Sequence, residues 1–348
     1  MLITLYVLSI IFIVSTYLPA TEIPHWFFRT PDFVRLQSLG IKAVLLALLL
    51  IFEDTYGTFA WILLLALIAT IVYEIVKVFP YSSWYPRRKP DFPSDGMISI
   101  LAANVLQPND CFGKFMDEVA RYDPDLVLTM ESNKDWEEGL AKLEETYSHT
   151  VKIPNEKLYG MHLYSKKELH NVKVNYHIED QVPSILCEIA INESTNLLLA
   201  CLHPAPPSPT ENETSEERDA ELMIVGKKIR ELDQPVVVCG DMNDVVWSRT
   251  TRLFKKMTAM IDPRVGRGFF PTYHAGYRLM RFPLDHLFHT KDLFVGTMER
   301  SNYFGSDHFG MYYEIYHKQH RHSETKGDLD SEENDEVEEK IENGKNKA

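Results

Sequence analysis

Three long apolar stretches near the start of the chain restrict its folding more than any other feature. They cover residues 2–19, 36–52 and 59–79, and their only charged residues are Lys42, Glu74 and Lys77. A helix of about 20 residues spans the hydrocarbon core of a bilayer, which is about 30 Å thick. We therefore predict that residues 1–79 form a membrane anchor of three transmembrane helices.

Two other interpretations of these stretches are open. The first stretch could be a cleaved signal peptide, although it lacks a basic start and two further apolar stretches follow it. The second could be a buried helix of a soluble domain, whereas in a bilayer Lys42 would have to extend its amine toward the surface. Aromatic residues beside the stretches, Trp26–Phe28 and Tyr81, Trp84 and Tyr85, are typical of the membrane–water interface.

The charges between the spans predict an orientation. Three spans place the two ends of the anchor on opposite sides of the membrane. The first connection holds Arg29 and Arg35, the second holds Glu53 and Asp54, and the third span is followed by Arg87, Arg88 and Lys89. Because positive residues favour the cytoplasmic side, we expect the first connection and the rest of the chain in the cytoplasm.

The chain after the third span has the pattern of a mixed α/β domain. Residues 80–96 (PYSSWYPRRKPDFPSDG) form a predicted linker, rich in Pro, Ser and aromatic residues. From residue 97 short apolar runs alternate with turn signals, which predicts strands at 97–104, 126–130, 161–165, 172–176, 185–191, 197–202, 236–239, 284–288 and 311–315. Helical spacing occurs at 113–122 and 216–232. Strands interrupted by helices favour an α/β sandwich over residues 97–317.

The last residues, 318–348, are acidic and contain almost no aromatic residue. Such a segment buries too little apolar surface to offset the entropy of ordering. We therefore predict an acidic disordered tail.

The charge of the domain limits its partners. Residues 91–317 carry most of the net charge of −14, and an acidic surface is a poor match for a protein that coats nucleic acid. A bound cation could still allow a nuclease. The four cysteines have no metal-binding spacing and lie mostly in apolar runs, so we interpret them as buried hydrophobic residues.

Polar residues that could carry chemistry follow one apolar run after another. They are Asn104 after ISILAA, Glu131 after LVLTM, His203 after LLLACL, Asp241 and Asn243 in GDMND, Asp285 and His286 in PLDHLF, and Asp307 and His308 in GSDHFG. Singly, each residue is more simply a turn or hydrogen-bonding residue at a strand end. Together they indicate a shared site at one rim of a sheet.

The order of these residues resembles the signature of the endonuclease/exonuclease/phosphatase, or DNase I-like, superfamily over residues 97–316. The GD-x-N, DH and SDH motifs carry the resemblance, and the three spans resemble the membrane-bound bacterial branch. It implies a four-layer α/β sandwich behind the three transmembrane helices. It also implies a hydrolase of phosphodiester or phosphomonoester bonds in the bacterial inner membrane.

The resemblance assigns roles to the motif residues. Phosphate-ester hydrolysis needs a hard cation and an activated water, so Mg²⁺ or Mn²⁺ is expected at Glu131, Asn104 and Asp307. Asp241 would orient or deprotonate the water, and Asn243 would donate to a phosphate oxygen. Asp285 would pair with His308 and favour its imidazolium form, while His203 would act near the leaving group. His286 would face away from the site, because it follows Asp285 on a strand.

The substrate is less constrained. Arg267, Thr272 and Tyr273, in GRGFFPTYHAG, resemble a substrate-side loop, although simple loop packing is an equal alternative. The membrane anchor favours phospholipid head groups, and nucleotides or nucleic acid are other candidates within the superfamily. No sequence feature indicates a protein partner.

Two rival functions remain. The domain could be a catalytically silent binding module, which loss of a motif residue would favour, but every motif residue is present. The spans could form a channel or transporter, but they hold few ionisable residues.

Overall fold

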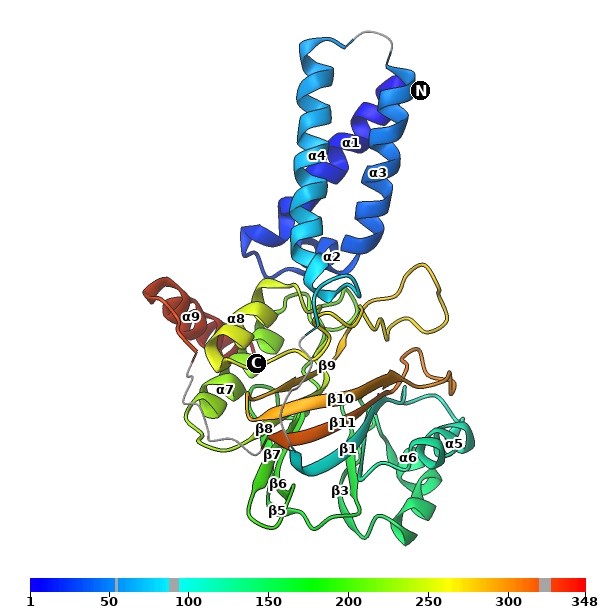
Figure 1. Ribbon diagram of the computed structural model, residues 1–348, viewed down its shortest axis with the longest axis vertical. Coiled ribbons are helices and arrows are strands. Elements are labelled where there is room, and N and C mark those ends of the chain that lie inside the picture. Colours follow the sequence, from blue (N-terminus) through cyan, green and yellow to red (C-terminus); the bar gives the residue numbers. More distant parts are fainter. Residues whose placement is uncertain (54–55, 88–93, 319–326) are drawn as a thin grey trace.

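The computed structural model describes residues 1–53, 56–87, 94–318 and 327–348. A bundle of helices from the start of the chain lies on one end of an α/β domain (Figure 1). The predictions that involve Asp54, Arg88 and Lys89, and part of the predicted linker and tail, lie outside the described residues.

The bundle contains the three predicted long helices. They are α1 (Leu2–Tyr17), α3 (Arg35–Phe52) and α4 (Thr58–Val78), extended by the short 3-10 helices η1 (Leu18–Thr21) and η2 (Phe79–Tyr81). All three are long and apolar enough to cross a membrane. Leu45, Leu49, Leu64 and Leu67 pack between them, while many other apolar side chains face outward, as expected for helices surrounded by lipid.

The charged residues of the bundle are paired inside it. The Nζ of Lys42 lies 2.8 Å from a carboxylate oxygen of Glu74 and 2.5 Å from the Thr16 hydroxyl. Arg35 forms an ion pair with Asp32 and lies 3.9 Å from Glu74. Lys42 therefore does not extend to the surface as the sequence suggested, because Glu74 from the neighbouring helix neutralises it in place.

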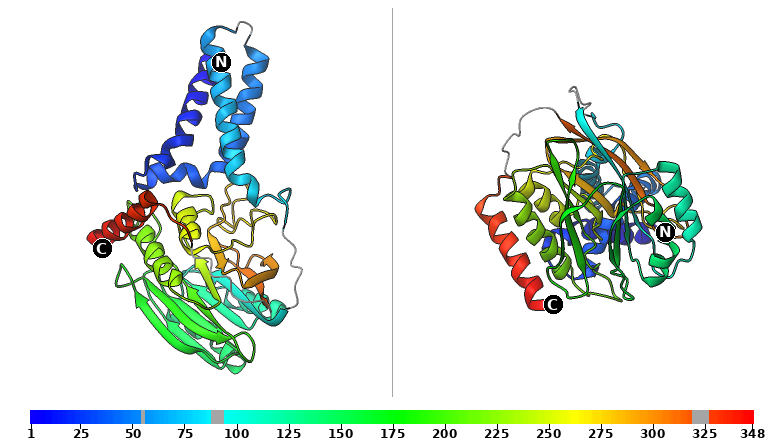
Figure 2. Two further views of the ribbon diagram at one scale, coloured as in Figure 1. Left: turned by 60° about the vertical axis from the view of Figure 1, so that its left-hand side comes forward. Right: turned by 90° about the horizontal axis from the view of Figure 1, so that it is seen from below.

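A short helix, α2 (Trp26–Phe33), lies between the bundle and the domain (Figures 1 and 2). Its segment forms hydrogen bonds with the domain: Trp26 N donates to Glu213 O at 2.9 Å, and Ser215 N donates to Pro24 O at 2.8 Å. The indole of Trp247 donates to Asp32 O at 2.8 Å. The anchor and the domain are thus joined by more than the covalent linker.

The domain is built on two packed sheets. The six-stranded sheet has the order β10-β11-β1-β2-β4-β3 and the five-stranded sheet β5-β6-β7-β8-β9. Their strands are β1 (Ser94–Asn104), β2 (Leu126–Met130), β3 (His149–Ile153), β4 (Met161–Ser165), β5 (His170–Tyr176), β6 (Pro183–Ala190), β7 (Asn196–Cys201), β8 (Val236–Asp241), β9 (Asp285–His289), β10 (Leu293–Arg300) and β11 (Met311–Lys318).

Helices cover the outer face of each sheet. The helices α5 (Phe112–Tyr122) and α6 (Lys134–Gly139), with η3 (Ala141–Glu145), pack on the six-stranded sheet, and α7 (Glu216–Arg230) and α8 (Arg249–Thr258) pack on the five-stranded one. Side chains such as Ile100, Leu128 and Leu199 fill the space between the sheets. The predicted four-layer α/β sandwich is therefore confirmed.

Two expectations about segments next to the domain were wrong. Strand β1 begins at Ser94, inside the predicted linker. Tyr81 is not an interfacial aromatic: its ring packs against Trp247 and its hydroxyl donates to Val246 O at 3.1 Å. Trp84, by contrast, is 86 % exposed.

The predicted disordered tail contains a helix, α9 (Ser331–Lys347), which packs along α7. Asp330 begins it with a reciprocal capping interaction with Glu333. Leu329, Val337 and Ile341 join the apolar cluster on the five-stranded sheet. Residues spaced four apart on a helix share one face, so two apolar side chains suffice to attach an otherwise polar helix.

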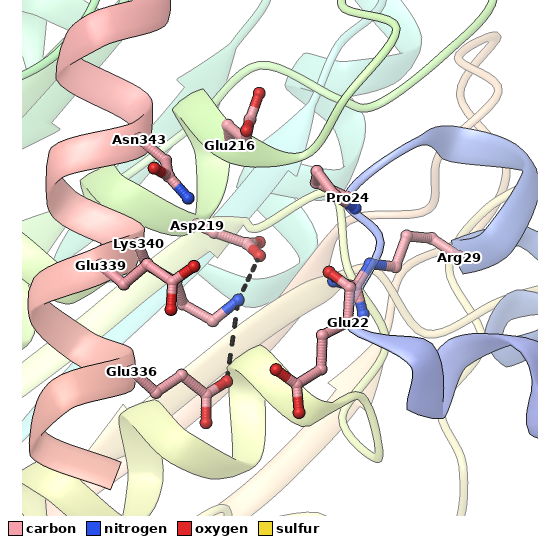
Figure 3. A pocket seen from close by; sticks show the side chains of 9 residues that line it. All are labelled: Glu22, Pro24, Arg29, Glu216, Asp219, Glu336, Glu339, Lys340 and Asn343. Carbon is pink, nitrogen blue, oxygen red and sulfur yellow. Dashed lines mark hydrogen bonds and ion pairs between the residues drawn. The ribbon is translucent and has the colours of Figure 1, made fainter. Parts of the chain in front are cut away.

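An ion pair at the inner side of α9 adds to this packing. Figure 3 shows Lys340 between two carboxylates, with its Nζ 2.9 Å from Asp219 of α7 and 3.8 Å from Glu336. Asp219 is buried, and its pair with Lys340 is largely removed from water. The amino-acid composition of the segment did not predict these contacts.

Candidate active site

The strands deliver the predicted polar residues to one end of the sandwich. Strands β1 and β2 run parallel, as do β7 and β8, so Asn104, Glu131, His203 and Asp241 follow the same ends of their sheets. Strand β9 runs antiparallel to β8 and begins at Asp285, which lies opposite Asp241. The segment before β11 brings in Asp307 and His308.

Asn104 joins the two sheets at this end. Its side-chain amide donates to Glu131 Oε1 at 2.7 Å and to Asp241 Oδ2 at 3.2 Å. Glu131 has a φ of 58°, a left-handed conformation that turns its side chain out of the strand direction. Burial raises the pKa of Glu131 to about 7, and the nearby charges of Asp307 and Asp241 act in the same direction.

His308 lies between two buried aspartates. Its Nδ1 is 2.8 Å from Asp285 Oδ2, and its Nε2 is 3.5 Å from Asp241 Oδ2. Burial alone would lower the pKa of His308, but Asp285 and Asp241 raise it to about 10. His308 is therefore an imidazolium at neutral pH, with one ring nitrogen held by Asp285.

Asp241 is ionised in the same cluster. Burial opposes its charge, but positively charged His308 holds the pKa of Asp241 below its usual value. Its Oδ1 accepts a hydrogen bond from Asn243 N at 2.9 Å. The second oxygen faces the two histidines and Asn104, where a carboxylate can accept a proton.

His203 is the second histidine at this carboxylate. It is buried, and its Nε2 lies 4.0 Å from Asp241 Oδ2. Its Nδ1 has no hydrogen-bond partner among the described residues. Burial lowers the pKa of His203, so the ring is neutral here.

The loop after β8 is fixed by hydrogen bonds on the side away from the cleft. Asn243 has a φ of 49°, and its side-chain amide donates to Pro204 O at 3.0 Å, so this donor points at the protein rather than into the cleft. The guanidinium of buried Arg218 donates to Asn243 O at 2.8 Å and forms an ion pair with Asp219. Arg218 was not predicted, because a helix residue remote from the motifs carries no motif signal.

The donors for a metal ion fall into two adjoining groups. Asp241, Asp285 and His308 have ligand atoms within 4.8 Å of one another. The predicted set is Asn104, Glu131 and Asp307, and within the described residues Asp307 Oδ1 is a buried oxygen without a hydrogen-bond partner. His308 is positively charged and already bonded, which disfavours the first group. In the predicted set Glu131 Oε1 accepts from the Asn104 amide and Asn104 Oδ1 accepts from Leu106 N at 3.0 Å, so the unpartnered oxygen of Asp307 is the feature of this set that fits a hard cation.

The three residues predicted on the substrate side have different places. Tyr273 lines the cleft, with its ring 4.9 Å from that of His308. Thr272 lies behind the site, where its hydroxyl accepts from Asp285 N at 3.4 Å. Arg267 is directed to β10, donating to the carbonyls of Gly296 and Val295, so loop packing is the better description of that residue.

His286 lies beside the site but not in it. Its Nε2 is 2.7 Å from Asp244 O, and the buried ring packs near Phe288. Alternation along β9 places it on the face opposite Asp285. The structure agrees with the expectation of a structural residue.

These side chains open into one cleft with a volume of about 700 Å³. Glu131, His203, Asp241, Asp307 and His308 line it, and so do residues of the anchor: Trp26, Arg29, Thr30, Phe33 and Val34. The sequence did not predict the contribution of the anchor. The cluster Trp26–Phe28 was the available signal, but its aromatic residues are also typical of a membrane interface.

Comparisons with known proteins agree on the fold. The sequence model of the Endonuclease/Exonuclease/phosphatase family matches residues 101–308, more than half of the chain. No curated protein matches the chain.

Solved structures with similar folds come from several organisms. A D. rerio TDP2 complexed with a single-strand DNA product has a TM-score of 0.54 and 17% identity, covering 64% of this chain and 99% of that one. An endonuclease/exonuclease/phosphatase from Beutenbergia cavernae has a TM-score of 0.52 and 16% identity, covering 64% of this chain and 72% of that one. The human Nocturnin catalytic domain with bound sulfate has a TM-score of 0.51 and 15% identity, covering 65% of this chain and 97% of that one.

Proposed function

Because the chain belongs to the endonuclease/exonuclease/phosphatase family, we propose that it is a membrane-anchored, divalent-metal-dependent hydrolase of phosphodiester or phosphomonoester bonds. Most members of this family are phosphate-ester hydrolases. The observation that carries the proposal is the buried Asp285–His308–Asp241 series at the cleft floor. It sets a positive imidazolium, which can bind a phosphate oxygen, beside an ionised carboxylate, which can accept a proton from water.

Two side chains in the cleft position the phosphate, and the amide of Asn243 would have to turn toward it. The imidazolium of His308 offers its Nε2 proton to a phosphate oxygen, while Asp285 keeps the ring in place through Nδ1. Tyr273 lies against the ring of His308 and limits where the ester can sit. Asn243 would have to exchange its bond to Pro204 O for one to the phosphate.

In the proposed reaction Asp241 accepts one proton and His203 donates one. Asp241 accepts a proton from the attacking water, whose oxygen forms the new bond to phosphorus. The bond from phosphorus to the alcohol oxygen then breaks. The negative phosphate favours protonated His203 when it binds, and that proton passes to the leaving alcohol.

A metal ion completes the site in this proposal. Mg²⁺ or Mn²⁺ held by Asn104, Glu131 and Asp307 would neutralise phosphate charge and polarise the phosphorus–oxygen bond. The unpartnered oxygen of Asp307 in the described structure supports this ligand set. The proposed location is a bacterial inner membrane, with the domain on the cytoplasmic side.

The test uses the full chain purified in detergent. Hydrolysis of bis-p-nitrophenyl phosphate, p-nitrophenyl phosphate, supercoiled DNA and phospholipids is measured with Mg²⁺, with Mn²⁺ and with EDTA. We expect metal-dependent turnover that falls about a thousandfold in Asp241→Ala and in His308→Ala. A folded, metal-binding protein that hydrolyses neither ester, nor DNA, nor phospholipid would instead be a catalytically silent binding module.

A further inference from the structure

One wall of the catalytic cleft belongs to the membrane anchor. Thr30, Phe33 and Val34, in and after α2, line the same cavity as Glu131, Asp241 and His308. This wall is apolar at Phe33 and Val34. A substrate that reaches the catalytic residues therefore lies against the anchor itself.

The same wall lies at the end of the candidate spans. Val34 directly precedes Arg35, where the second span begins, and the first span ends at Thr21, five residues before α2 begins at Trp26. The third span ends at Tyr81, whose hydroxyl bonds to the domain. With the spans in a bilayer, the cleft opens at the level where hydrocarbon gives way to head groups.

A loop of the domain forms the second apolar side of the opening. Met280 and Phe282 line the cleft, and the ring of Phe282 packs edge-on against that of Phe33. The backbone oxygen of Leu279 accepts a hydrogen bond from Gln37 in α3 at 2.9 Å. The loop thus reaches the second span, as the yellow-gold loop beside the foot of the bundle in Figure 1 shows.

The tip of this loop is exposed and carries two large apolar side chains, on either side of exposed Arg278. Leu279 is 85 % exposed and Tyr277 is 64 % exposed. Such side chains next to a membrane span are more stable among lipid head groups and upper acyl chains than in water. The tip therefore brings the rim of the cleft into contact with the membrane surface.

The charges of the cleft disfavour a nucleic acid substrate. Among the described residues that line it, Arg29 is the only lysine or arginine, whereas Glu131, Glu211, Asp241 and Asp307 are acidic. Arg29 already donates to the carbonyls of Pro19 and Glu22. Strand binding relies on several basic residues along a groove, and here the groove is closed on one side by the anchor.

We propose that the substrate is the phosphate ester of a bilayer lipid, which enters from the membrane with its phosphate at Asp241 and His308 and its apolar part along Phe33, Val34, Met280 and Phe282. This inference rests on the proposed hydrolase function. Water supplies the oxygen that bonds to phosphorus, one phosphorus–oxygen ester bond breaks, and the alcohol leaves with the proton from His203. The cleft volume of about 700 Å³ accommodates a head group, while the acyl chains stay in the bilayer.

The experiment uses the full chain reconstituted in phosphatidylcholine vesicles that contain phosphatidic acid or phosphatidylglycerol. Release of inorganic phosphate, phosphorylated head group or diacylglycerol is measured with Mg²⁺ and Mn²⁺. The same vesicles are assayed with bis-p-nitrophenyl phosphate and with single-stranded DNA. We expect at least one lipid to be hydrolysed about tenfold or more faster than the DNA, per phosphate ester.

A pair of matched variants distinguishes an effect of the apolar rim from the general effect of adding a charge to the protein. Met280→Glu places a charge on the rim at a side chain that is 45 % exposed, and Val172→Glu does the same at 41 % exposure in β5, at the end far from the anchor (Figure 1). We expect the ratio of lipid to soluble-ester hydrolysis to fall about tenfold in Met280→Glu, because a carboxylate repels acyl chains. In Val172→Glu the ratio stays at the wild-type value.

Each outcome has a distinct meaning. Turnover of the soluble ester without turnover of any lipid would overturn the lipid inference and leave the hydrolase function standing. DNA cleavage faster than lipid cleavage would do the same and point to a nuclease. An unchanged ratio in Met280→Glu would also contradict the proposed entry path. Absence of turnover on every substrate would remove both proposals together.

Discussion

Two histidine–aspartate pairs in this chain share a geometry but not an environment. His308 lies 2.8 Å from buried Asp285 at the cleft floor, and His317 lies 2.7 Å from Asp95 at the surface. Only the buried pair is removed from water, where an interaction between charges is strong. Burial alone lowers the pKa of His308, but the buried carboxylates of Asp285 and Asp241 act on it without screening by water and raise it to about 10.

Asp285→Asn should therefore impair catalysis without unfolding the domain. The amide keeps the size of the carboxylate but removes the charge that holds His308 as imidazolium. We expect kcat for bis-p-nitrophenyl phosphate to fall about a hundredfold, with a smaller change in KM. Asp95→Asn is the control and should retain wild-type kcat. Equal losses in both variants would contradict a special role for the buried pair.

The metal site can be tested by stability rather than activity. An ion that binds only the folded protein raises the free energy of unfolding by about 2.7 kcal/mol at a hundred times its dissociation constant. We expect Mg²⁺ or Mn²⁺ to raise Tm by about 5–10 °C and EDTA to reverse the shift. Glu131→Gln should abolish the shift, whereas Glu211→Gln, also in the cleft, should keep it. Retention of the shift in Glu131→Gln would exclude Glu131 as a ligand.

Helix α9 is connected to the catalytic loop by a short series of buried charges. Lys340 of α9 contacts Asp219, Asp219 pairs with Arg218, and Arg218 donates to the backbone of Asn243. Asp219 also accepts from Thr250 of α8 at 2.8 Å. The position of the loop after β8 thus depends in part on a helix from the end of the chain.

Lys340→Met should weaken this connection. Loss of one cation leaves buried Asp219 less compensated, which we expect to cost about 1–3 kcal/mol of unfolding free energy and several-fold in kcat. Lys227→Met is the matched control, because Lys227 pairs with Glu338 across the same two helices at 2.6 Å but in contact with solvent. That surface pair should contribute less than about 1 kcal/mol. Denaturant unfolding and steady-state kinetics of both variants test whether the Lys340 contact contributes more than the surface pair of Lys227.

The strands buried on both faces were located most accurately from the sequence, although the exposed edge strand β5 was also predicted, at 172–176. Strand β2 and strand β4 were located with the correct bounds, because a short continuous apolar run between turn signals is typical of a strand buried on both faces. Strand β3, with the sequence HTVKI, is half-buried at a sheet edge. Its polar residues interrupt the apolar run that would have predicted a strand. Helix α9 was missed because two apolar residues are too few to detect by composition, although they suffice once α7 supplies the opposite face.

The candidate site was predictable where strand ends fix it and unpredictable where loops do. Parallel pairing of β1 with β2 brings Asn104 and Glu131 to one rim, and pairing of β7 with β8 does the same for His203 and Asp241. The packing of the two sheets then brings both rims together. The residues Arg267 and Thr272 lie in a loop, so their directions follow from contacts that the sequence does not show. The approach of α2 to the cleft depends on how the anchor docks, which no local pattern specifies.

In the proposed lipid hydrolase, the arrangement of anchor and domain makes the membrane part of the catalytic site. If the three candidate spans cross a bilayer, the connection between α3 and α4 lies on one side and the domain on the other. Arg29 and Arg35 lie on the domain side, and Glu53 lies at the opposite end. The positive-inside rule therefore predicts a cytoplasmic domain, which would act on the inner leaflet.

Two single cysteines test this orientation. Cys111 is first changed to serine, because the other three cysteines are buried. Gly57→Cys lies before α4 with open space around its new side chain, and Tyr176→Cys lies in exposed β5. In intact spheroplasts, a maleimide that cannot cross membranes should label the cysteine at position 57 at once. It should label the cysteine at position 176 only after lysis, because the bilayer separates the domain from the reagent. The reverse pattern would place the domain outside the cytoplasm and the cleft against the outer leaflet, so only lipids of that leaflet could enter from the anchor side.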